Sequence, residues 1–286
     1  MNTIVRLALQ KSGRLHDGSI NLLRESGMHI SNGRDQLKTT VRNFPVEILF
    51  LRDDDIPQYI EDRVADIGIV GENVLAEKNK SVRLVQRLDF AKCRLSIAIP
   101  KSEKYTGLTW LEGKNIATSY PVVARKFLLE NNIQATLHEI SGSVEIAPGI
   151  GLADAICDLV STGSTLLSNG LKEVEVVMQS EAVLIASPAL LPEKEKIVEK
   201  LLFRIKAVQS ARNNKYILLN CPDEAIAKIT SVIPGMNSPT IMPLGRKGWS
   251  SLHSVVNEND FWEKIDLLKS CGAEGILVIP IEKMIA

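Results

Sequence analysis

Two carboxylates and a hydroxyl-rich loop lie close together in the stretch DAICDLVSTGSTL, residues 154–166. If residues 155–160 form a strand, side chains four positions apart point to one face, so Asp154 and Asp158 can line one edge of a pocket. Carboxylates accept hydrogen bonds from sugar hydroxyls. The two acids are therefore candidate catalytic and sugar-binding residues. The alternative is that one caps a strand end and the other is solvated.

The loop that follows the acids has the composition of a phosphate site. At a strand-to-helix turn, unpaired backbone N–H groups and the helix dipole favour an anion, and Gly163 permits a close approach of the backbone. The predicted phosphate ligands are Ser161, Thr162, Gly163, Ser164 and Thr165. Acids followed by such a loop suit a ribose 5-phosphate, with its hydroxyls on the acids and its phosphate on the loop. A plain Ser/Thr cap of the helix is the alternative.

A second predicted strand-to-helix turn lies near the start of the sequence, in LQKSGRLHDG. Lys11 and Arg14 flank Ser12 and Gly13 there, which provides two cations and N–H groups for a polyphosphate. A turn that is only capped and solvated would have the same composition. The prediction becomes specific if both turns lie at the mouth of one cleft.

Further candidate residues follow other predicted strands. Arg52 and Asp53 stand at the carboxyl end of a strand, where ligand sites of α/β proteins tend to lie. Glu72 lies in the turn GEN. Tyr120 lies in the turn TSYP, where it could stack on a base or cover the rim of the core. The histidines and cysteines show no spacing typical of a metal site or a catalytic triad, so neither a metal site made by the protein alone nor covalent catalysis is expected.

The charge and hydropathy patterns exclude several classes of protein. The sequence holds 34 basic and 34 acidic residues, so its net charge favours neither a nucleic acid nor an anionic membrane as a partner. No apolar run approaches the roughly 20 residues that cross a bilayer. The first apolar run contains Arg6 and is too charged for the core of a signal peptide. Cysteines without paired spacing fit a reducing compartment, and a cytoplasmic protein is expected.

The elements that must position these residues alternate between short β-branched runs and amphipathic helices, which predicts an α/β fold. Two lobes are expected, one of residues 1–99 with 172–214 and one of residues 100–171, which carries the phosphate loop. Residues 174–187 resemble an antiparallel pair of strands. Two α/β lobes with two chain crossings resemble a periplasmic-binding-protein-like core of type II, whose ligand lies in the cleft between lobes.

The last part of the sequence has a different order of elements. Residues 215–286 predict strand, helix, two strands, helix and strand, in that order. This βαββαβ order is the ferredoxin-like split motif, an ACT-like arrangement. A third, compact domain is therefore expected at this end.

The sequence resembles the long form of the ATP phosphoribosyltransferase family. The segment EIAPGIGLADAICDLVSTGSTL matches the family motif, and further matching stretches are QKSGRL, RDDDIP, GIVGENVL, CRLSIAIP, IATSYP and ILVIPIEKM. One departure is Gly149, where similar sequences commonly have an arginine. The resemblance implies a glycosyltransferase that joins 5-phosphoribosyl 1-pyrophosphate to N1 of ATP and releases pyrophosphate, the first step of L-histidine biosynthesis.

The resemblance also implies roles for single residues. It puts Asp154 and Asp158 at the ribose hydroxyls, adds Glu145 to the donor site, and makes Lys11 and Arg14 the other catalytic residues. The residues expected to face ATP are Lys11, Ser12, Gly13, Arg14, Arg52, Asp53, Glu72 and Tyr120. Mg²⁺ would be held mainly by substrate phosphates and waters, because this ion dehydrates reluctantly.

Long forms of the family carry a C-terminal regulatory domain and are inhibited by L-histidine. The stretch PGMNSPT, residues 234–240, matches the segment that contacts the inhibitor, so Met236, Ser238 and Thr240 are expected contacts, together with Asn220. An ordinary loop before a strand is the alternative. The resemblance implies homo-oligomers, a dimer and a hexamer. Two other classes share the general plan: a prephenate-dehydratase-like lyase, whose TRF and ESRP stretches this sequence lacks, and a non-enzymatic ligand sensor.

Overall fold

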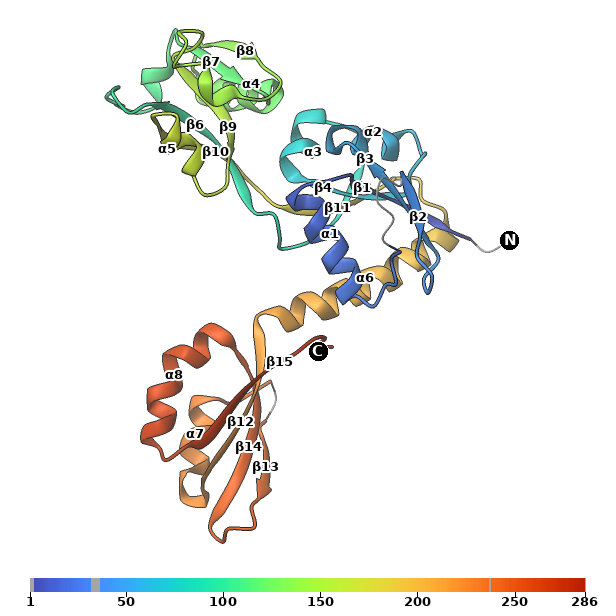
Figure 1. Cartoon of the computed structure of the whole chain (residues 1–286), viewed down its shortest axis with the longest axis vertical. Coiled ribbons are helices and arrows are strands. Elements are labelled where there is room, and N and C mark those ends of the chain that lie inside the picture. The colour runs from blue at the N-terminus through green and yellow to red at the C-terminus, as the bar shows by residue number, and fades with distance from the viewer. Residues whose placement is uncertain (1–2, 32–36, 237, 286) are drawn as a thin grey trace. The chain divides into compact units, whose positions relative to one another are not determined.

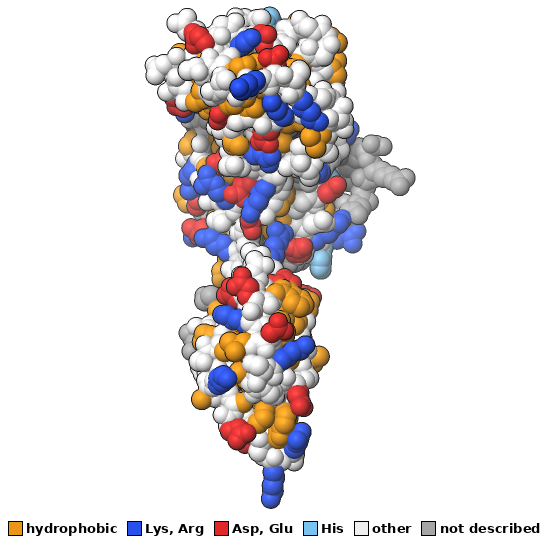
Figure 2. All heavy atoms as spheres, turned by 90° about the vertical axis from the view of Figure 1, so that its left-hand side faces the viewer, with side chains coloured by type: hydrophobic (Ala, Val, Ile, Leu, Met, Phe, Trp, Pro, Cys, Tyr) orange, Lys and Arg blue, Asp and Glu red, His pale blue; other side chains and the backbone are white. Residues whose placement is uncertain are grey.

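The computed structural model describes residues 3–31, 37–236 and 238–285. The chain divides into two compact units, residues 1–24 with 28–199 and residues 25–27 with 200–286. The first unit holds two sheets with their helices, and the second holds one sheet (Figure 1). Acidic and basic side chains intermingle on the face shown in Figure 2, in keeping with their equal numbers. Within the described ranges, no helix is long and apolar enough to cross a membrane.

The first lobe is built on a six-stranded sheet in the order β2-β3-β1-β4-β11-β5. Its strands are β1 (Val5–Gln10), β2 (Lys38–Thr40), β3 (Val46–Leu51), β4 (Ile67–Gly71), β5 (Arg83–Arg87) and β11 (Ala182–Ala186). Its helices are α1 (Arg14–Glu25), α2 (Ile56–Glu61) and α3 (Glu72–Lys78), with a 3-10 turn at Asp53–Asp55. Strands β4 and β11 are apolar and buried almost throughout, as expected when helices cover both faces of a sheet.

The second lobe is built on a five-stranded sheet in the order β10-β6-β9-β7-β8. Its strands are β6 (Cys93–Pro100), β7 (Asn115–Thr118), β8 (Thr136–Glu139), β9 (Ala155–Val160) and β10 (Leu171–Ser180). Its helices are α4 (Pro121–Glu130) and α5 (Ser164–Ser168), with 3-10 turns at Leu108–Leu111 and Val144–Ile146. The core between sheet and helices includes Leu95, Ile116 and Leu128, all buried.

Both lobes repeat one order of strands. In the first, β1 lies between its parallel neighbours β3 and β4, and β11 runs antiparallel beyond β4. In the second, β7 lies between its parallel neighbours β8 and β9, and β6 runs antiparallel beyond β9. Each antiparallel strand directly adjoins a chain crossing between the lobes. This repeat confirms the predicted two-lobed α/β core.

The predicted lobe boundaries are wrong at both crossings. Strands β6 and β10 belong to the second sheet, so the chain changes lobes at residues 88–92 and again at Glu181, not at residues 99 and 171. The pair predicted within residues 174–187 is also wrong. β10 pairs with β6, whereas β11 pairs with β4 and β5. Alternation of apolar residues predicts strands but does not specify their partners, which explains both errors.

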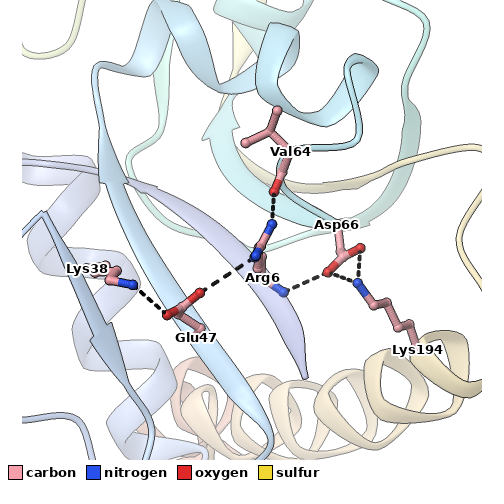
Figure 3. Close-up of polar contacts among 6 residues, drawn as sticks. All are labelled: Arg6, Lys38, Glu47, Val64, Asp66 and Lys194. Carbon is pink, nitrogen blue, oxygen red and sulfur yellow. Dashed lines mark hydrogen bonds and ion pairs between the residues drawn. The ribbon is translucent and has the colours of Figure 1, made fainter. Parts of the chain in front are cut away.

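A polar network stabilises the amino ends of the strands in the first lobe (Figure 3). The carboxylate of Asp66 accepts hydrogen bonds from the backbone N of Arg6 at 2.8 Å and from Nζ of Lys194 at 2.8 Å. Lys194 belongs to α6 (Pro192–Arg212). Glu47 lies 3.6 Å from the Arg6 guanidinium and 3.5 Å from Lys38. These charged side chains therefore stabilise the end of the sheet that lies opposite to the carboxyl ends of β1, β3 and β4.

The C-terminal sheet has the order β13-β14-β12-β15, with every neighbouring pair antiparallel. Its strands are β12 (Asn214–Pro222), β13 (Thr240–Pro243), β14 (Trp249–Asn257) and β15 (Glu274–Pro280). Its helices are α7 (Ile226–Val232) and α8 (Glu258–Ser270), with a 3-10 turn at Asp223–Ala225. Ile229 and Phe261 anchor the two helices to one apolar core with the strands. The order of elements and the order in the sheet confirm the predicted ferredoxin-like domain.

Candidate functional site

A cavity of about 260 Å³ lies between the two lobes, at the carboxyl ends of their central strands. The first lobe contributes Arg14, Asp53 and Asn73, and the second contributes Tyr120 and Ser161. Ala91 and Lys92 of the first crossing and Cys93, the first residue of β6, also line it. In doubly wound sheets the carboxyl ends of strands are where ligands bind, so the cavity has the position of a ligand site in both lobes at once.

The hydroxyl loop enters this cavity as the predicted strand-to-helix turn. Gly163 has φ of 80°, a left-handed conformation, and caps the N-terminus of α5. The hydroxyls of Thr162 and Ser164 lie 3.1 Å apart. The first N–H groups of a helix have no partner within it, so the start of α5 presents donors beside three hydroxyl side chains. The loop can therefore hold a phosphate oxygen by backbone and side chain together.

Asp158 lies near the carboxyl end of β9, three residues before Ser161. Burial raises the pKa of its carboxyl to about 6; the hydrogen bond that its Oδ1 accepts from the backbone N of Leu159, at 2.8 Å, opposes this rise, and the charge of Glu145 adds to it. Glu145 is thus close enough to act on Asp158 electrostatically. The structure brings these two carboxylates together beside the hydroxyl loop.

Asp154 lies at the other end of β9, and the prediction that it shares a pocket edge with Asp158 is wrong. Its carboxylate accepts a hydrogen bond from the backbone N of Asn115 at 2.9 Å and lies 3.7 Å from Nζ of Lys114. It lines a separate cavity of about 310 Å³ with Trp110. Two residues four positions apart on a strand point to the same face but lie about 13 Å from each other. The predicted periodicity was therefore correct, but the distance is too long for both carboxylates to line one pocket edge.

The turn after β1 carries the predicted cations. Gly13 has φ of 93°, and α1 begins at Arg14. Nη1 of Arg14 donates a hydrogen bond to Oγ of Ser161 at 3.0 Å, which joins the two predicted anion turns across the cavity. Lys11 and Ser12 are exposed in the same turn, and the backbone N of Lys11 donates to the carbonyl of Leu51 at 2.8 Å. The two turns therefore do lie at the mouth of one cleft.

The predicted site residues after β3 and after β4 line two different cavities. Asp53 lines the cavity between the lobes, and burial together with the charge of Asp54 raises the pKa of its carboxyl. Arg52 is exposed next to it. Glu72 lines a neighbouring cavity of about 530 Å³ at the chain crossings, where its carboxylate meets Arg87 at 2.5 Å. The structure thus does not bring Glu72 into the cavity that Asp53 lines.

Sequence reasoning missed the basic side chains of the crossings. Arg87, Lys92 and Arg94 line the second cavity, and Lys92 and Ser161 line both cavities. Arg94 pairs with Glu173 of β10 and donates to the carbonyl of Ser161 at 3.4 Å. Arg87 ends β5, Lys92 lies in the crossing and Arg94 is the second residue of β6, so their spacing could have marked them only if the crossing had been placed correctly.

Tyr120 directly precedes α4 and lines the cavity. Burial raises the pKa of its hydroxyl above its ordinary value, a hydrogen bond from Asn73 opposes the rise, and the charges of Asp158, Asp53 and Asp54 add to it. The phenol therefore stays protonated at neutral pH. A neutral hydroxyl among carboxylates can donate a hydrogen bond, and the ring supplies an apolar face for a base.

The residues predicted to bind histidine lie in the C-terminal domain. Asn220 is on β12 and Thr240 begins β13, and the register places both on the sheet face opposite to α7 and α8, with β14 between them. Met236 and Ser238 lie in the connection before β13, and the side chain of Met236 is 51% exposed. Residue 237 of the matching stretch lies outside the described residues.

Metal ligands do not gather in the part of the chain that the structure describes: no group of three or more His, Cys, Asp or Glu side chains could hold an ion there. The four cysteines, Cys93, Cys157, Cys221 and Cys271, are free thiols.

The chain matches two family models. One, described as ATP phosphoribosyltransferase (HisG), matches residues 52–207, and the other, described as the HisG C-terminal domain, matches residues 211–283. The ATP phosphoribosyltransferase of Cytophaga hutchinsonii is 61% identical over 285 residues, covering 100% of both chains. That of Bacteroides thetaiotaomicron is 55% identical over 282 residues, covering 99% of this chain and 100% of its own.

Two solved structures resemble the chain to different degrees. A chain of the ATP phosphoribosyl transferase (HisG:HisZ) complex from Thermotoga maritima superposes with a TM-score of 0.61 at 28% identity, over 71% of this chain and 99% of that chain. A protein called Tv2483, solved bound to L-arginine, has a TM-score of 0.52 at 12% identity, over 72% of this chain and 85% of that chain. The second likeness concerns the fold alone.

Proposed function

The chain belongs to the ATP phosphoribosyltransferase family, the pentosyltransferases of the first step of histidine biosynthesis, and we propose that its interlobe cavity carries out the transfer. The substrates would be ATP and 5-phosphoribosyl 1-pyrophosphate. One observation carries the assignment to this cavity: Arg14 of the first lobe meets Ser161 of the hydroxyl loop at 3.0 Å, three residues from the partly buried Asp158. The lyase and sensor alternatives have no such support.

We assign the ribosyl donor to the second lobe. The loop of residues 161–165 would bind the 5-phosphate, and Asp158 with Glu145 would accept hydrogen bonds from the ribose hydroxyls. Glu145 thus takes the role that was predicted for Asp154. An ionised Asp158 would also stabilise positive charge that develops on the ribosyl ring as the pyrophosphate leaves.

The cations around the cavity would hold the phosphate chains. Arg14 lines the cavity, with Lys11 in the same turn, and Lys92 and Arg94 extend the basic surface to the crossings. Guanidinium and ammonium groups neutralise the charge that a pyrophosphate leaving group acquires. Tyr120, with its ring in the cavity, is the proposed contact for the adenine.

The bond changes need little from the protein beyond alignment. The N1 lone pair of adenine forms a bond to the anomeric carbon of the ribose, and the bond from that carbon to the pyrophosphate oxygen breaks with its electron pair. Holding the two reactants in line and stabilising the departing charge can supply much of the rate acceleration. Mg²⁺ would remain on substrate phosphates and waters, with Asp53 and Asp158 available as acceptors for those waters.

The C-terminal domain would make the enzyme responsive to its pathway's product. Asn220, Met236, Ser238 and Thr240 would contact L-histidine, and binding would shift a homodimer toward a homohexamer. The match of residues 211–283 to the family's C-terminal model supports a domain of this kind. The free thiols support a cytoplasmic setting.

The activity is tested by incubating the protein with ATP, Mg²⁺ and the ribosyl donor, with pyrophosphatase to remove pyrophosphate. Phosphoribosyl-ATP should accumulate and be detected by its absorbance and by mass. A lack of product with intact, folded protein would overturn the proposal. Sedimentation of the same protein with and without L-histidine tests the regulation separately, since an unchanged sedimentation coefficient together with uninhibited turnover would contradict it.

A further inference from the structure

Helix α3 turns one face toward the second lobe. Asn73 and Glu77 are four residues apart on α3, so they lie one above the other on that face. Asn73 meets Tyr120, and Glu77 meets the start of α4, which Tyr120 directly precedes. Both contacts thus join the same two elements across the cavity.

Asn73 is held at every polar atom of its side chain. It is 5% exposed; its Oδ1 accepts a hydrogen bond from Oγ of Ser180 at 2.8 Å, and its Nδ2 donates to Oη of Tyr120 at 3.0 Å. Its backbone N donates to Oγ of Ser180 at 3.0 Å. Ser180 is the last residue of β10, at the second crossing. The network therefore ties the crossing, the first lobe and the cavity-lining phenol together.

Glu77 caps helix α4 from the other lobe. Its Oε1 accepts from the backbone N of Val122 at 2.9 Å and its Oε2 from that of Val123 at 3.0 Å. No side chain of the preceding residue caps α4. A carboxylate on the first N–H groups of a helix makes charge-assisted bonds and interacts favourably with the helix dipole.

We propose that Asn73 and Glu77 form a clasp that holds the lobes closed and sets Tyr120 in the cavity, which makes them positioning residues for the transfer. The inference rests on the proposed function for its readout. Neither residue needs to touch substrate. A donor that meets Arg14 in one lobe and the hydroxyl loop in the other binds only when the lobes are closed, so the closed fraction scales its apparent affinity.

The first test compares Glu77→Gln with Glu112→Gln. Glu112 accepts a hydrogen bond from the backbone N of Gln134 at 3.0 Å, but both residues belong to the second lobe, so this variant loses the same kind of bond without affecting the clasp. Glu77→Gln should raise the KM for 5-phosphoribosyl 1-pyrophosphate by about tenfold, the effect of losing one charge-assisted bond. Glu112→Gln should leave KM unchanged.

A fragment that depends less on closure gives a second readout. Ribose 5-phosphate lacks the pyrophosphate, so it would bind mainly through the hydroxyl loop and Asp158, and Arg14 would reach it only at Ser161. Its dissociation constant, measured by calorimetry, should therefore rise much less in Glu77→Gln than that of the complete donor. Equal weakening of both ligands would show that Glu77 maintains the second lobe rather than closure, and would overturn the inference.

A double-mutant cycle tests whether Asn73 acts through Tyr120. We expect Asn73→Ala and Tyr120→Phe each to lower kcat/KM by about tenfold and the double variant to lower it by little more, because neighbours in one network are not additive. Effects that multiply to about a hundredfold would overturn the link. Tyr120→Phe removes one hydroxyl and keeps the ring, so it remains informative if Asn73→Ala does not fold.

The outcomes separate the inference from the proposed function. If wild type and Glu112→Gln make phosphoribosyl-ATP and Glu77→Gln matches them in KM, the clasp is refuted and the function stands. If wild type makes no phosphoribosyl-ATP, the proposed function fails. Calorimetry with the donor then still decides the clasp, because it compares Glu77→Gln with Glu112→Gln without turnover.

Discussion

The two lobes of the first unit share one strand order but present opposite chemistry at the carboxyl ends of their strands. In the first lobe, the turn after β1 supplies the cations Lys11 and Arg14. In the second, the end of β9 supplies the partly buried carboxylate Asp158 and then a loop of hydroxyls. Neither set alone recognises a pyrophosphorylated sugar. The comparison teaches that a repeated scaffold builds its site from what the two copies do not share.

The largest effect should come from removing the charge of the second lobe. Asp158→Asn should lower kcat/KM for the ribosyl donor by about a hundredfold or more, because in the proposed function this carboxylate would stabilise charge in the transition state. Initial rates at saturating ATP and varied donor measure this. Asp154→Asn is the matched control on the same strand and should change the rate by less than about twofold. Equal losses of kcat/KM in both variants would mean that Asp154 and Asp158 act together at the site, which would contradict their separation in the structure.

The charge of the first lobe should come next. Arg14→Gln should lower kcat/KM for the donor by about thirtyfold, through the loss of charged hydrogen bonds to the leaving group. Arg14→Lys should recover part of it, since it keeps the charge but not the planar fork. The same kinetic assay decides. A normal rate in Arg14→Gln would mean that the first lobe only encloses the site.

A smaller loss should follow from straining the loop of the second lobe. Gly163 has φ of 80°, so Gly163→Ala should weaken donor binding by about tenfold through backbone strain. Gly149→Ala is the control, because its φ is not left-handed and a Cβ there meets nothing closer than 3.5 Å. Calorimetry with the donor should find Gly149→Ala unchanged. Comparable weakening in both would point to loss of a side-chain-free surface rather than strain.

Lowering the pH should gradually protonate Asp158 and so remove the negative charge that distinguishes the second lobe from the first. The pKa of Asp158 is raised to about 6, and the proposed role of Asp158 requires its ionised form. The donor kcat/KM should therefore be about fourfold below its plateau at pH 5.5 and fall tenfold per further pH unit. A profile of kcat/KM against pH measures this. Asp158→Asn should flatten the acid limb, and an unchanged limb would assign it to another group.

The smallest effect should be on stability. The folded pKa of Asp158 lies above the unfolded value near 3.9, so its stabilising contribution is present at low pH and is lost as pH rises through about 6. At pH 8 the buried charge is unfavourable, and Asp158→Asn should raise the melting temperature by about 2–4 °C. At pH 4 the difference between variant and wild type should vanish. Differential scanning calorimetry at both pH values checks this.

The sequence predicted what local chemistry determines. The turns at Gly13 and Gly163 have glycines in left-handed conformations and follow apolar strands. A glycine after an apolar run is a local signal, so the positions of these turns could be predicted from the sequence. The ferredoxin-like order was likewise visible, because its strands and helices follow one another without interruption. The condition set for the two predicted anion turns, that both lie at one cleft, is met by Arg14 and Ser161, since the carboxyl ends of strands in both lobes face the cavity that these residues line.

What the sequence could not predict depends on distant partners. Asp154 looks equivalent to Asp158 until its bond to the backbone of Asn115 is known. Glu72 looks like a cavity residue until its pairing with Arg87 is known. Asn73 and Glu77 carry no local signal at all, because their partners lie about 45 positions further along the chain. Side chains that act across lobes are specified by tertiary structure and not by motif.

The antiparallel strands have a consequence for how the protein is made. Residues 93–180 form all five strands of the second sheet, so that lobe is complete in one continuous segment. The first sheet lacks β11 until residues 182–186 have left the ribosome. We therefore expect the second lobe, although it is synthesised later, to finish folding first. Until then the first sheet is incomplete, because the position of β11 between β4 and β5 is unfilled. During translation, β11 is the strand that closes the older half of the molecule.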